Sequence, residues 1–226
     1  ALGGRLNAET LAVDGRAGSD WVAETVAELA SMSNVRLMPR TTVYGAYDHG
    51  VYGALERCTD HLAGSGGKPR QVLWRVYSRR AVLAAGATER PIAFGNNDRP
   101  GVMLAGAVRA YLNRWGVAAG RNVVVFCNND SAPRTVGDLQ AAGVHVAALV
   151  DARPHARCAQ DVAFYPGARV IGTGGRGGIE SVRLATQAGT ERIAADVLAV
   201  SGGWTPTVHL ACTWAGARSG TRRARR

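Results

Sequence analysis

The segment from residue 122 to residue 151 contains the residue pattern with the clearest chemical meaning. A β-branched run at residues 122–126 is followed by the polar turn Asn-Asn-Asp-Ser at residues 128–131. In a dinucleotide-binding βαβ unit, the pyrophosphate sits at the N-terminus of the helix after such a turn, because free N–H groups and the helix dipole favour an anion there. An acidic residue about twenty positions further on accepts hydrogen bonds from the adenosine ribose. Asp151 stands 24 positions after Cys127 and fits that role.

The turn itself lacks the glycines of a dinucleotide fingerprint. Where G-x-G-x-x-G is expected, residues 127–132 read Cys-Asn-Asn-Asp-Ser-Ala. Asn128 and Asn129 can make the turn, because asparagine adopts positive φ more readily than most residues. Asp130 argues against a ligand, because its carboxylate would repel a pyrophosphate. Two interpretations stay open: a dinucleotide site that uses Asn128, Asn129 and Asp151, or a Rossmann-like unit that holds no ligand.

Two strand exits are further candidates for ligand contact. Ala85-Gly86-Ala87-Thr88 ends the apolar run at residues 81–85, and Gly86 and Ala87 allow a ligand to approach the backbone closely. Residues 196–203 have the same form, with an acid, four apolar residues and the final pair Gly202-Gly203. Each could also be an ordinary exit from a strand into a loop.

The elements that must position these residues follow from local patterns. Residues 122–126 are predicted as a strand, 134–142 as a helix ended by Gly143, and 144–150 as a strand. A strand–helix–strand of about thirty residues implies a parallel pair with a right-handed crossover. The all-apolar run at 81–85 is typical of a buried parallel strand. We also expect helices over 21–33 and 102–115, strands over 34–39, 42–47, 53–57, 71–77, 168–171, 179–185 and 196–200, and a loop over 62–70.

Composition excludes some classes of protein. The chain has 226 residues and a mass of 23.7 kDa, and at 46% hydrophobic residues it can bury a core. No apolar run approaches the roughly 18–20 residues of a membrane helix, and the start of the chain lacks the regions of a signal peptide, so we expect a cytoplasmic protein without a membrane partner.

The net charge of +10 is unevenly distributed. Residues 213–226 carry five arginines and no acid, so the remaining chain has 22 basic against 17 acidic residues, or +5. The tail could bind phosphate backbones through charge alone, or be a solvated end. Since the chain offers no recognised nucleic-acid motif, a nucleic-acid partner is not favoured.

Few residues are candidates for direct chemistry. The four cysteines (Cys58, Cys127, Cys158 and Cys212) form no CxxC pair, and the five histidines are scattered. We therefore expect no metal site. No residue stands out as a general base or nucleophile, so no catalytic residue is predicted.

The strand exits resemble those of flavoproteins with two dinucleotide-binding domains. Such proteins have an A-x-G/A-T-G-type exit before an inserted NAD domain and a D-x-L-x-x-x-G strand where the chain returns, and residues 84–91 and 196–203 match these two places. Leu2-Gly3-Gly4-Arg5-Leu6 looks like the G-G-x-L that follows the second strand of the first domain. More narrowly, the chain resembles the alpha subunits of heterotetrameric sarcosine oxidase, over about residues 3–210. The segments that carry this likeness are 43–50, 95–103, 127–130 and 200–206.

The resemblance implies a function and a set of partners. It implies a complex that oxidises sarcosine to glycine and passes the one-carbon unit to tetrahydrofolate or releases it as formaldehyde. In that family the amine-oxidising flavin belongs to the beta subunit, a covalent FMN lies at the alpha–beta interface, and the alpha subunit holds NAD and a folate-type domain. Implied partners are beta, gamma and delta subunits and a small amine. The cofactor-binding residues would be Gly3, Gly4, Ala85, Gly86, Ala87, Thr88, Asn128, Asn129, Asp151, Gly202 and Gly203.

The expected fold class is α/β, of the FAD/NAD(P)-binding Rossmann-like type with two dinucleotide-binding domains, incomplete at both ends. Residues 1–92 would form a first, FAD-type domain without its GxGxxG unit, and residues 93–195 the inserted NAD-type domain. Residues 196–210 would return to the first domain, and 211–226 would be an aberrant arginine-rich tail, such as a frameshift gives. The strand at 81–85 would then have an unpaired edge. The alternative function is a non-catalytic module that binds nucleotide or packs against other subunits.

Overall fold

The computed structural model describes residues 2–215, and the chain divides into two compact units. Unit 1 comprises Ala1–Gly4, Glu24–Ala87 and Pro206–Arg226, and unit 2 comprises Arg5–Ala23 and Thr88–Thr205. Most of the predicted aberrant tail lies outside the described residues.

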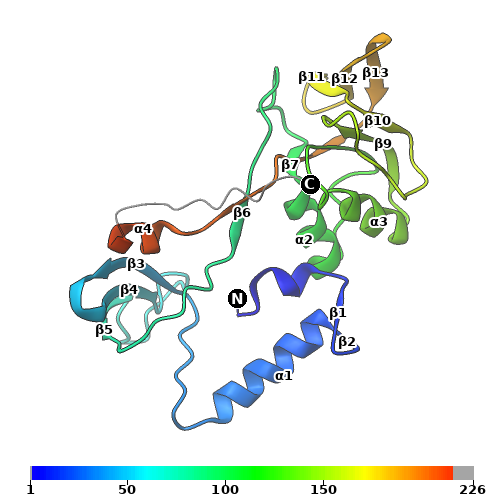
Figure 1. Cartoon of the computed structure of the whole chain (residues 1–226). Coiled ribbons are helices and arrows are strands. Elements are labelled where there is room, and N and C mark those ends of the chain that lie inside the picture. The colour runs from blue at the N-terminus through cyan, green and yellow to red at the C-terminus, as the bar shows by residue number, and fades with distance from the viewer. Residues whose placement is uncertain (1, 216–226) are drawn as a thin grey trace. The chain divides into compact units, whose positions relative to one another are not determined.

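Unit 2 is built on a five-stranded sheet in which every neighbouring pair is parallel (Figure 1). In spatial order its strands are β10 (Phe164–Pro166), β9 (His145–Asp151), β8 (Asn122–Cys127), β14 (Val197–Ser201) and β7 (Val102–Leu104). The predicted βαβ unit is confirmed, with helix α3 (Pro133–Ala141) joining β8 to β9.

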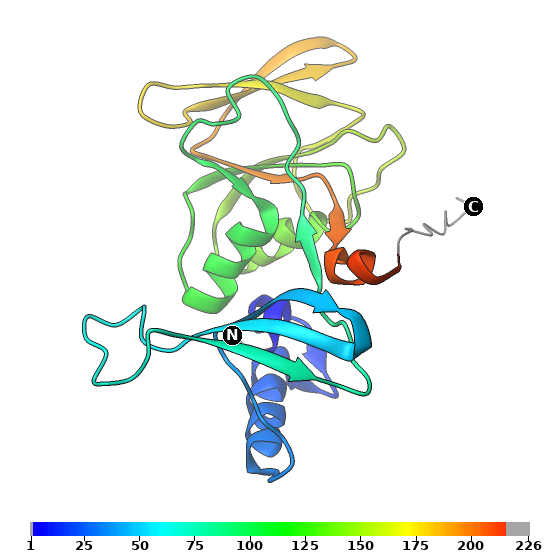
Figure 2. The same cartoon turned by 90° about the vertical axis from the view of Figure 1, so that its left-hand side faces the viewer.

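The central strands are apolar throughout because both faces of the sheet are covered. Successive side chains of a strand point to opposite faces. Val123 and Val125 of β8 pack with Val108 of helix α2 (Ala105–Trp115) and Val136 of α3. Val124 and Phe126 join a second cluster on the other face. Unit 2 therefore has three layers, with helices on one side of the parallel sheet and further strands on the other (Figure 2).

The third layer is an antiparallel sheet of β11 (Arg169–Gly174), β12 (Ser181–Thr186) and β13 (Gly189–Ala194). Val182 and Leu184 of β12 face the parallel sheet and are fully buried. β13 was not predicted, because the sequence Gly-Thr-Glu-Arg-Ile-Ala has no alternating apolar pattern; it forms by pairing with β12 along its whole length.

Unit 1 contains an antiparallel sheet in the order β3-β4-β5, with β3 (Thr41–Tyr47), β4 (Val51–Arg57) and β5 (Gln71–Tyr77). These strands match the predicted ranges closely, and helix α4 (His209–Ala215) packs against β3. Across the two units, the smaller elements of the described chain are the 3₁₀ helices η1 (Gly4–Ala8) and η2 (Asp48–Gly50), the hairpin β1 (Ala12–Val13) and β2 (Arg16–Ala17), the helix α1 (Gly18–Ser31), and the two-stranded ribbon of β6 (Ala87–Glu89) with β15 (Trp204–Pro206).

The predicted buried strand at residues 81–85 is wrong. The segment has no strand conformation, and Val82 is 92% exposed. A parallel strand obtains its hydrogen bonds from neighbouring strands, and none of the strands described within residues 2–215 runs beside this segment. An apolar sequence alone is therefore not enough to make this segment a strand, because it has no strand to pair with among the described residues.

Two further segments differ from their predictions. Residues 34–39 form no strand, since Pro39 cannot donate to a ladder and the segment pairs with no described neighbour. The helix predicted over 102–115 begins only at Ala105, because Val102–Leu104 pair with β14 as strand β7.

Residues 196–200 form a strand as predicted, but not as a return to the first domain. β14 lies in the middle of the sheet of unit 2, between β8 and β7. All five of its residues are buried, so this apolar strand needs cover on both faces, which only the interior of the sheet supplies.

Among the described helices, none combines the length and the apolar character that crossing a bilayer requires. Residues 2–215 also contain no group of three or more His, Cys, Asp or Glu side chains placed to hold a metal ion.

Two glycines of unit 2 give opposite expectations for substitution by alanine. A Cβ at Gly202 would lie 2.8 Å from the carbonyl oxygens of both Arg90 and Pro91, whereas a Cβ at Gly137, inside α3, would meet nothing within 4 Å. We expect Gly202→Ala to lower the free energy of unfolding by about 1–3 kcal/mol. Gly137→Ala should raise it by about 0.5–1 kcal/mol, because the helix loses a flexible residue. Urea unfolding measures both, and equal effects would contradict the packing at Gly202.

Candidate functional site

The candidate site of unit 2 lies at the carboxyl ends of three adjacent strands. Cys127 at the end of β8 is in register with Asp151 at the end of β9 and with Ser201 at the end of β14. Open α/β sheets bind their ligands at this edge. The structure therefore brings together the predicted residues Asn128, Asn129 and Asp151.

The turn after β8 is held by its own side chains. The Asn129 Oδ1 atom accepts hydrogen bonds from the backbone N–H and the hydroxyl of Ser131, and the Asn129 amide donates to the backbone carbonyl of Ser201 at 3.0 Å and to its hydroxyl at 3.1 Å. None of residues 128–131 has a positive φ. The expectation that asparagines make this turn through left-handed geometry is therefore wrong; side-chain hydrogen bonds make it instead.

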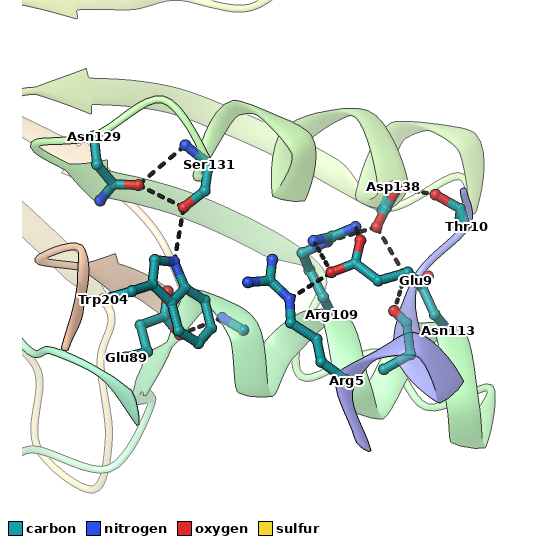
Figure 3. A network of polar contacts seen from close by, with 12 residues as sticks. Arg5, Glu9, Thr10, Glu89, Arg109, Asn113, Asn129, Ser131, Asp138 and Trp204 are labelled. Atoms are coloured by element: carbon teal, nitrogen blue, oxygen red, sulfur yellow. Dashed lines mark hydrogen bonds and ion pairs between the residues drawn. The ribbon is translucent and has the colours of Figure 1, made fainter. Parts of the chain in front are cut away.

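Trp204 lies against the same turn. Its indole Nε1 donates to the Ser131 hydroxyl at 3.0 Å, and the Arg5 guanidinium stands 4.2 Å from the centre of its ring (Figure 3). A Cβ on Gly106, in the first turn of α2, would lie 3.3 Å from the ring. The indole therefore fills the space between the start of α2 and the turn that precedes α3.

A carboxylate closes the N-terminus of α2. Glu89 is 8% exposed, and its Oε2 atom accepts the backbone N–H of Gly106 at 2.7 Å. A negative charge at this end of a helix is favoured by the dipole and satisfies one of the free N–H groups. The position that could attract an anion is thus taken by an internal one.

The carboxylate of Asp151 accepts hydrogen bonds from Arg153, two residues further along the chain. Its Oδ1 accepts the Arg153 backbone N–H at 2.9 Å and Nε at 3.0 Å, and its Oδ2 accepts Nη2 at 2.7 Å. Arg153 also forms an ion pair with Asp130 at 2.7 Å. The hydrogen bonds that Arg153 donates to Asp151 raise the pKa of Arg153 above its ordinary value, against the effect of burial, and Asp130 adds to the rise.

Cys127 is a fully buried thiol beside this group. Its Sγ lies 3.4 Å from the Asp151 Oδ2 atom. Burial, together with the negative charge of Asp151, raises the pKa of Cys127 to about 12. A thiol that stays protonated is a poor nucleophile, so Cys127 is suited to packing rather than to catalysis.

The strand-exit glycines directly precede the two strands of the ribbon, Gly86 before β6 and Gly202 and Gly203 before β15. Within unit 1, the carbonyl of Gly86 accepts the backbone N–H of Thr207 at 2.9 Å. Within unit 2, the Gly202 N–H donates to Arg90 at 2.6 Å, and the Gly203 carbonyl accepts the Arg90 N–H at 2.8 Å. The remaining predicted residues are placed as follows: Ala85 lies in the segment before β6, Ala87 and Thr88 in β6, and Gly3 and Gly4 at positive φ at the start of η1.

An ion-pair network that the sequence did not reveal centres on Arg109 (Figure 3). Arg109 is 3% exposed, and its guanidinium bonds Asp138 of α3 at 2.7 Å and Glu9 at 2.9 Å. Asn113 adds hydrogen bonds to Asp138 and to the Ala8 carbonyl. Burial alone would lower the pKa of Arg109, but the two carboxylates outweigh it and the pKa is raised. No local pattern could predict the network, since Glu9 and Arg109 are 100 residues apart.

Comparison with known proteins identifies relatives along nearly the whole chain. The chain is 45% identical to sarcosine oxidase subunit alpha of Rhizobium meliloti (strain 1021) and 44% identical to that of Corynebacterium sp. (strain P-1), over 93% and 88% of its length. In both cases it spans 22% of the relative, so it corresponds to about a fifth of those subunits. No family model matches the chain.

Solved structures of FAD/NAD(P)-binding oxidoreductases share the fold. L-proline dehydrogenase from P. horikoshii superposes with a TM-score of 0.68 at 22% identity, over 95% of this chain and 37% of that one. Thioredoxin reductase from Lactococcus lactis superposes with a TM-score of 0.66 at 13% identity, over 94% and 70%. The predicted fold class, α/β and FAD/NAD(P)-binding Rossmann-like, is confirmed, and so is the predicted resemblance to the alpha subunits.

The raised pKa of Cys127 predicts a specific loss of stability at high pH. The unfolded thiol ionises near pH 9 and the folded one near 12, so the folded state keeps a proton that the unfolded state loses. The stabilisation is complete below pH 9 and decreases as the pH rises towards 12. Between pH 8 and pH 10.5, the free-energy difference between the wild type and Cys127→Ala should fall by about 2 kcal/mol. The control Val125→Ala, which removes no titrating group, should show a pH-independent difference; a constant difference for Cys127→Ala would contradict the prediction.

Arg109 should be essential to the stability of unit 2. Arg109→Ala leaves the carboxylate of Asp138 without its cation and Glu9 with Arg5 alone, which we expect to cost about 3 kcal/mol. Arg114 lies on the same helix but is exposed, so Arg114→Ala should change stability by no more than about 0.5 kcal/mol. Denaturant unfolding of the two variants tests this, and a similar small cost for both would show that the network does not hold unit 2 together.

Proposed function

Since the chain is homologous to about a fifth of sarcosine oxidase subunit alpha, we propose that it serves as part of an oxidoreductase subunit that takes part in the oxidative demethylation of sarcosine to glycine. The observation that carries the proposal is the 45% identity along 93% of the chain. The FAD/NAD(P)-binding fold supports the same reaction class.

We assign this chain a binding and scaffolding role within that reaction. A flavin, when bound in the complex, supplies the redox chemistry by accepting two electrons from the amine. The described residues fit a supporting role: Cys127 keeps its proton, and the buried carboxylates of Asp151 and Glu89 are already hydrogen-bonded. Oxidation of the amine would therefore depend on the flavin and on partner subunits of the beta, gamma and delta kind.

NAD is the dinucleotide that we propose for this chain, and unit 1, although the sequence suggested an FAD-type domain there, has residues that fit a dinucleotide. Gly86 adopts φ +70° and Gly4 adopts φ +50°, and a Cβ built on either would meet nothing within 4 Å. Such open, left-handed glycines allow a phosphate or sugar to approach the backbone. We therefore propose that Gly3, Gly4, Ala85, Gly86 and Ala87 of unit 1 contribute to the NAD site.

An apolar pocket in unit 1 favours packing against further polypeptide. The cavity has a volume of about 620 Å³ and is lined by Val43, Tyr52, Val76 and the segment 78–83. Val82 and Leu83 are 92% and 45% exposed. Exposed apolar surface of this kind marks an interaction site. It supports the second candidate function, a module that packs within the larger subunit or against its partners without catalysing a reaction itself.

The proposal is tested by replacing the homologous segment of the Rhizobium meliloti alpha subunit with residues 3–210 of this chain. The chimera is produced together with the partner subunits, and formaldehyde release from sarcosine and bound NAD are measured. We expect an assembled enzyme that oxidises sarcosine. Gly86→Asp should lower NAD content or affinity at least tenfold, since it places a carboxylate where the phosphate approaches.

The matched control is Gly66→Asp in the loop between β4 and β5. Gly66 also has a positive φ and open surroundings, so this variant introduces the same charge and the same backbone strain away from the ribbon. It should leave NAD binding unchanged. An assembled chimera that does not oxidise sarcosine would reject the oxidase proposal, and equal NAD binding by both variants would reject the role of Gly86.

A further inference from the structure

The two places where a dinucleotide-binding crossover holds pyrophosphate and ribose are both filled in unit 2 by side chains of the chain itself. We propose that the crossover of β8, α3 and β9 binds no dinucleotide, and that Trp204 and Arg153 are its permanent internal occupants. This inference concerns unit 2 alone and does not depend on the proposed function.

At the pyrophosphate position, two backbone N–H groups that could bind an anion are already bonded within the chain. The Asn128 N–H donates to the Ser201 carbonyl at 3.3 Å, and the Ser131 N–H donates to Asn129 Oδ1 at 3.0 Å. Helix α3 then begins with Pro133, which has no N–H. Anion binding at a helix start requires free donors, and in this turn the N–H groups of Asn128 and Ser131 are bonded to acceptors of the chain itself.

The indole of Trp204 covers the turn that a phosphate would have to reach. Its Nε1 bonds Ser131 on one side, its ring packs at Gly106, and Arg5 stacks over it. A ligand at the start of α3 would have to displace the indole and break both the hydrogen bond and the cation–π contact. Arg5 is itself held by Glu9, so the occupant is supported from the N-terminal segment of unit 2.

The ribose position is filled in the same way. A carboxylate has about four lone-pair sites, and Asp151 uses them for three donors of Arg153 and for the Cys127 thiol. Asp151 is also only 2% exposed. No acceptor is left for the hydroxyls of a ribose, and the exposed Asp130 carboxylate pairs with the same guanidinium at 2.7 Å.

The charge around the turn disfavours a dinucleotide as well. Asp130 adds an exposed carboxylate to the turn itself, Arg153 is paired with both Asp130 and Asp151, and Arg5, the cation over Trp204, is paired with Glu9. A pyrophosphate carries negative charge, so the carboxylate of Asp130 would repel it. The sequence-based assignment of Asn128, Asn129 and Asp151 to a cofactor site therefore does not fit the geometry, whereas the alternative of a Rossmann-like unit without a ligand does.

Hydrogen exchange measured by mass spectrometry on the 226-residue chain tests the inference. Exchange is followed in peptides covering residues 122–134 and 145–157, with and without millimolar NAD⁺ or NADP⁺. We expect no nucleotide-dependent change in either peptide. Saturable protection of these peptides by either nucleotide would overturn the proposal, whereas protection confined to unit 1 would not.

A pair of tryptophan variants tests the role of the occupant. Trp204→Phe keeps the ring but removes the donor to Ser131, so exchange in the 122–134 peptide should become about fivefold faster, as expected for one lost hydrogen bond of about 1 kcal/mol. Trp115 is 63% exposed on α2, so Trp115→Phe should leave this exchange unchanged. If the two variants behave alike, Trp204 is not an occupant of the turn.

Discussion

The position of β14 in the middle of a parallel sheet is the constraint on which the rest of unit 2 depends. The strand bonds β8 on one side and β7 on the other, although it follows β8 by about seventy residues of chain. Both of its ends are fixed to the neighbouring strand. At the start, the Asp196 carboxylate accepts the backbone N–H groups of Arg121 and Asn122, each at 2.9 Å. At the end, the backbone carbonyl of Ser201 accepts a hydrogen bond from the side-chain amide of Asn129. A slip in register would break both contacts at once.

The same arrangement explains why the candidate site is filled. Because β14 ends beside β8, the next residues of the chain pass over the turn before α3, and Trp204 is delivered onto Ser131. The indole N–H of Trp204 is partly buried there and gains an acceptor, since a donor left unsatisfied on burial costs about 1–3 kcal/mol. Ser131 supplies that acceptor and is in turn oriented by Asn129. The polar residues of the turn thus satisfy one another, and the network is complete without a ligand.

The local part of this structure could be predicted from sequence and the distant part could not. The βαβ unit at 122–151 and strand β5 at 71–77 were predicted because the β-branched runs and the helix-ending glycine act within a few residues. The placement of β14, the pairing of β13 and the contact of Trp204 with Ser131 depend on residues far apart in the chain. The segment 81–85 shows that local composition alone can also predict too much. Its composition is that of a strand, but no strand among the described residues pairs with it.

Fold likeness and ligand binding therefore have to be argued from different observations in this chain. Backbone superposition at 13–22% identity places it among FAD/NAD(P)-binding folds, but superposition does not register whether a turn is open or filled. The side chains do. Gly86 leaves its surroundings open, whereas the turn before α3 has its donors, its acceptors and its space taken by Asn129, Trp204 and Arg153. The surroundings of the two places therefore differ, and the difference lies in whether the polar groups there are already satisfied by the chain itself.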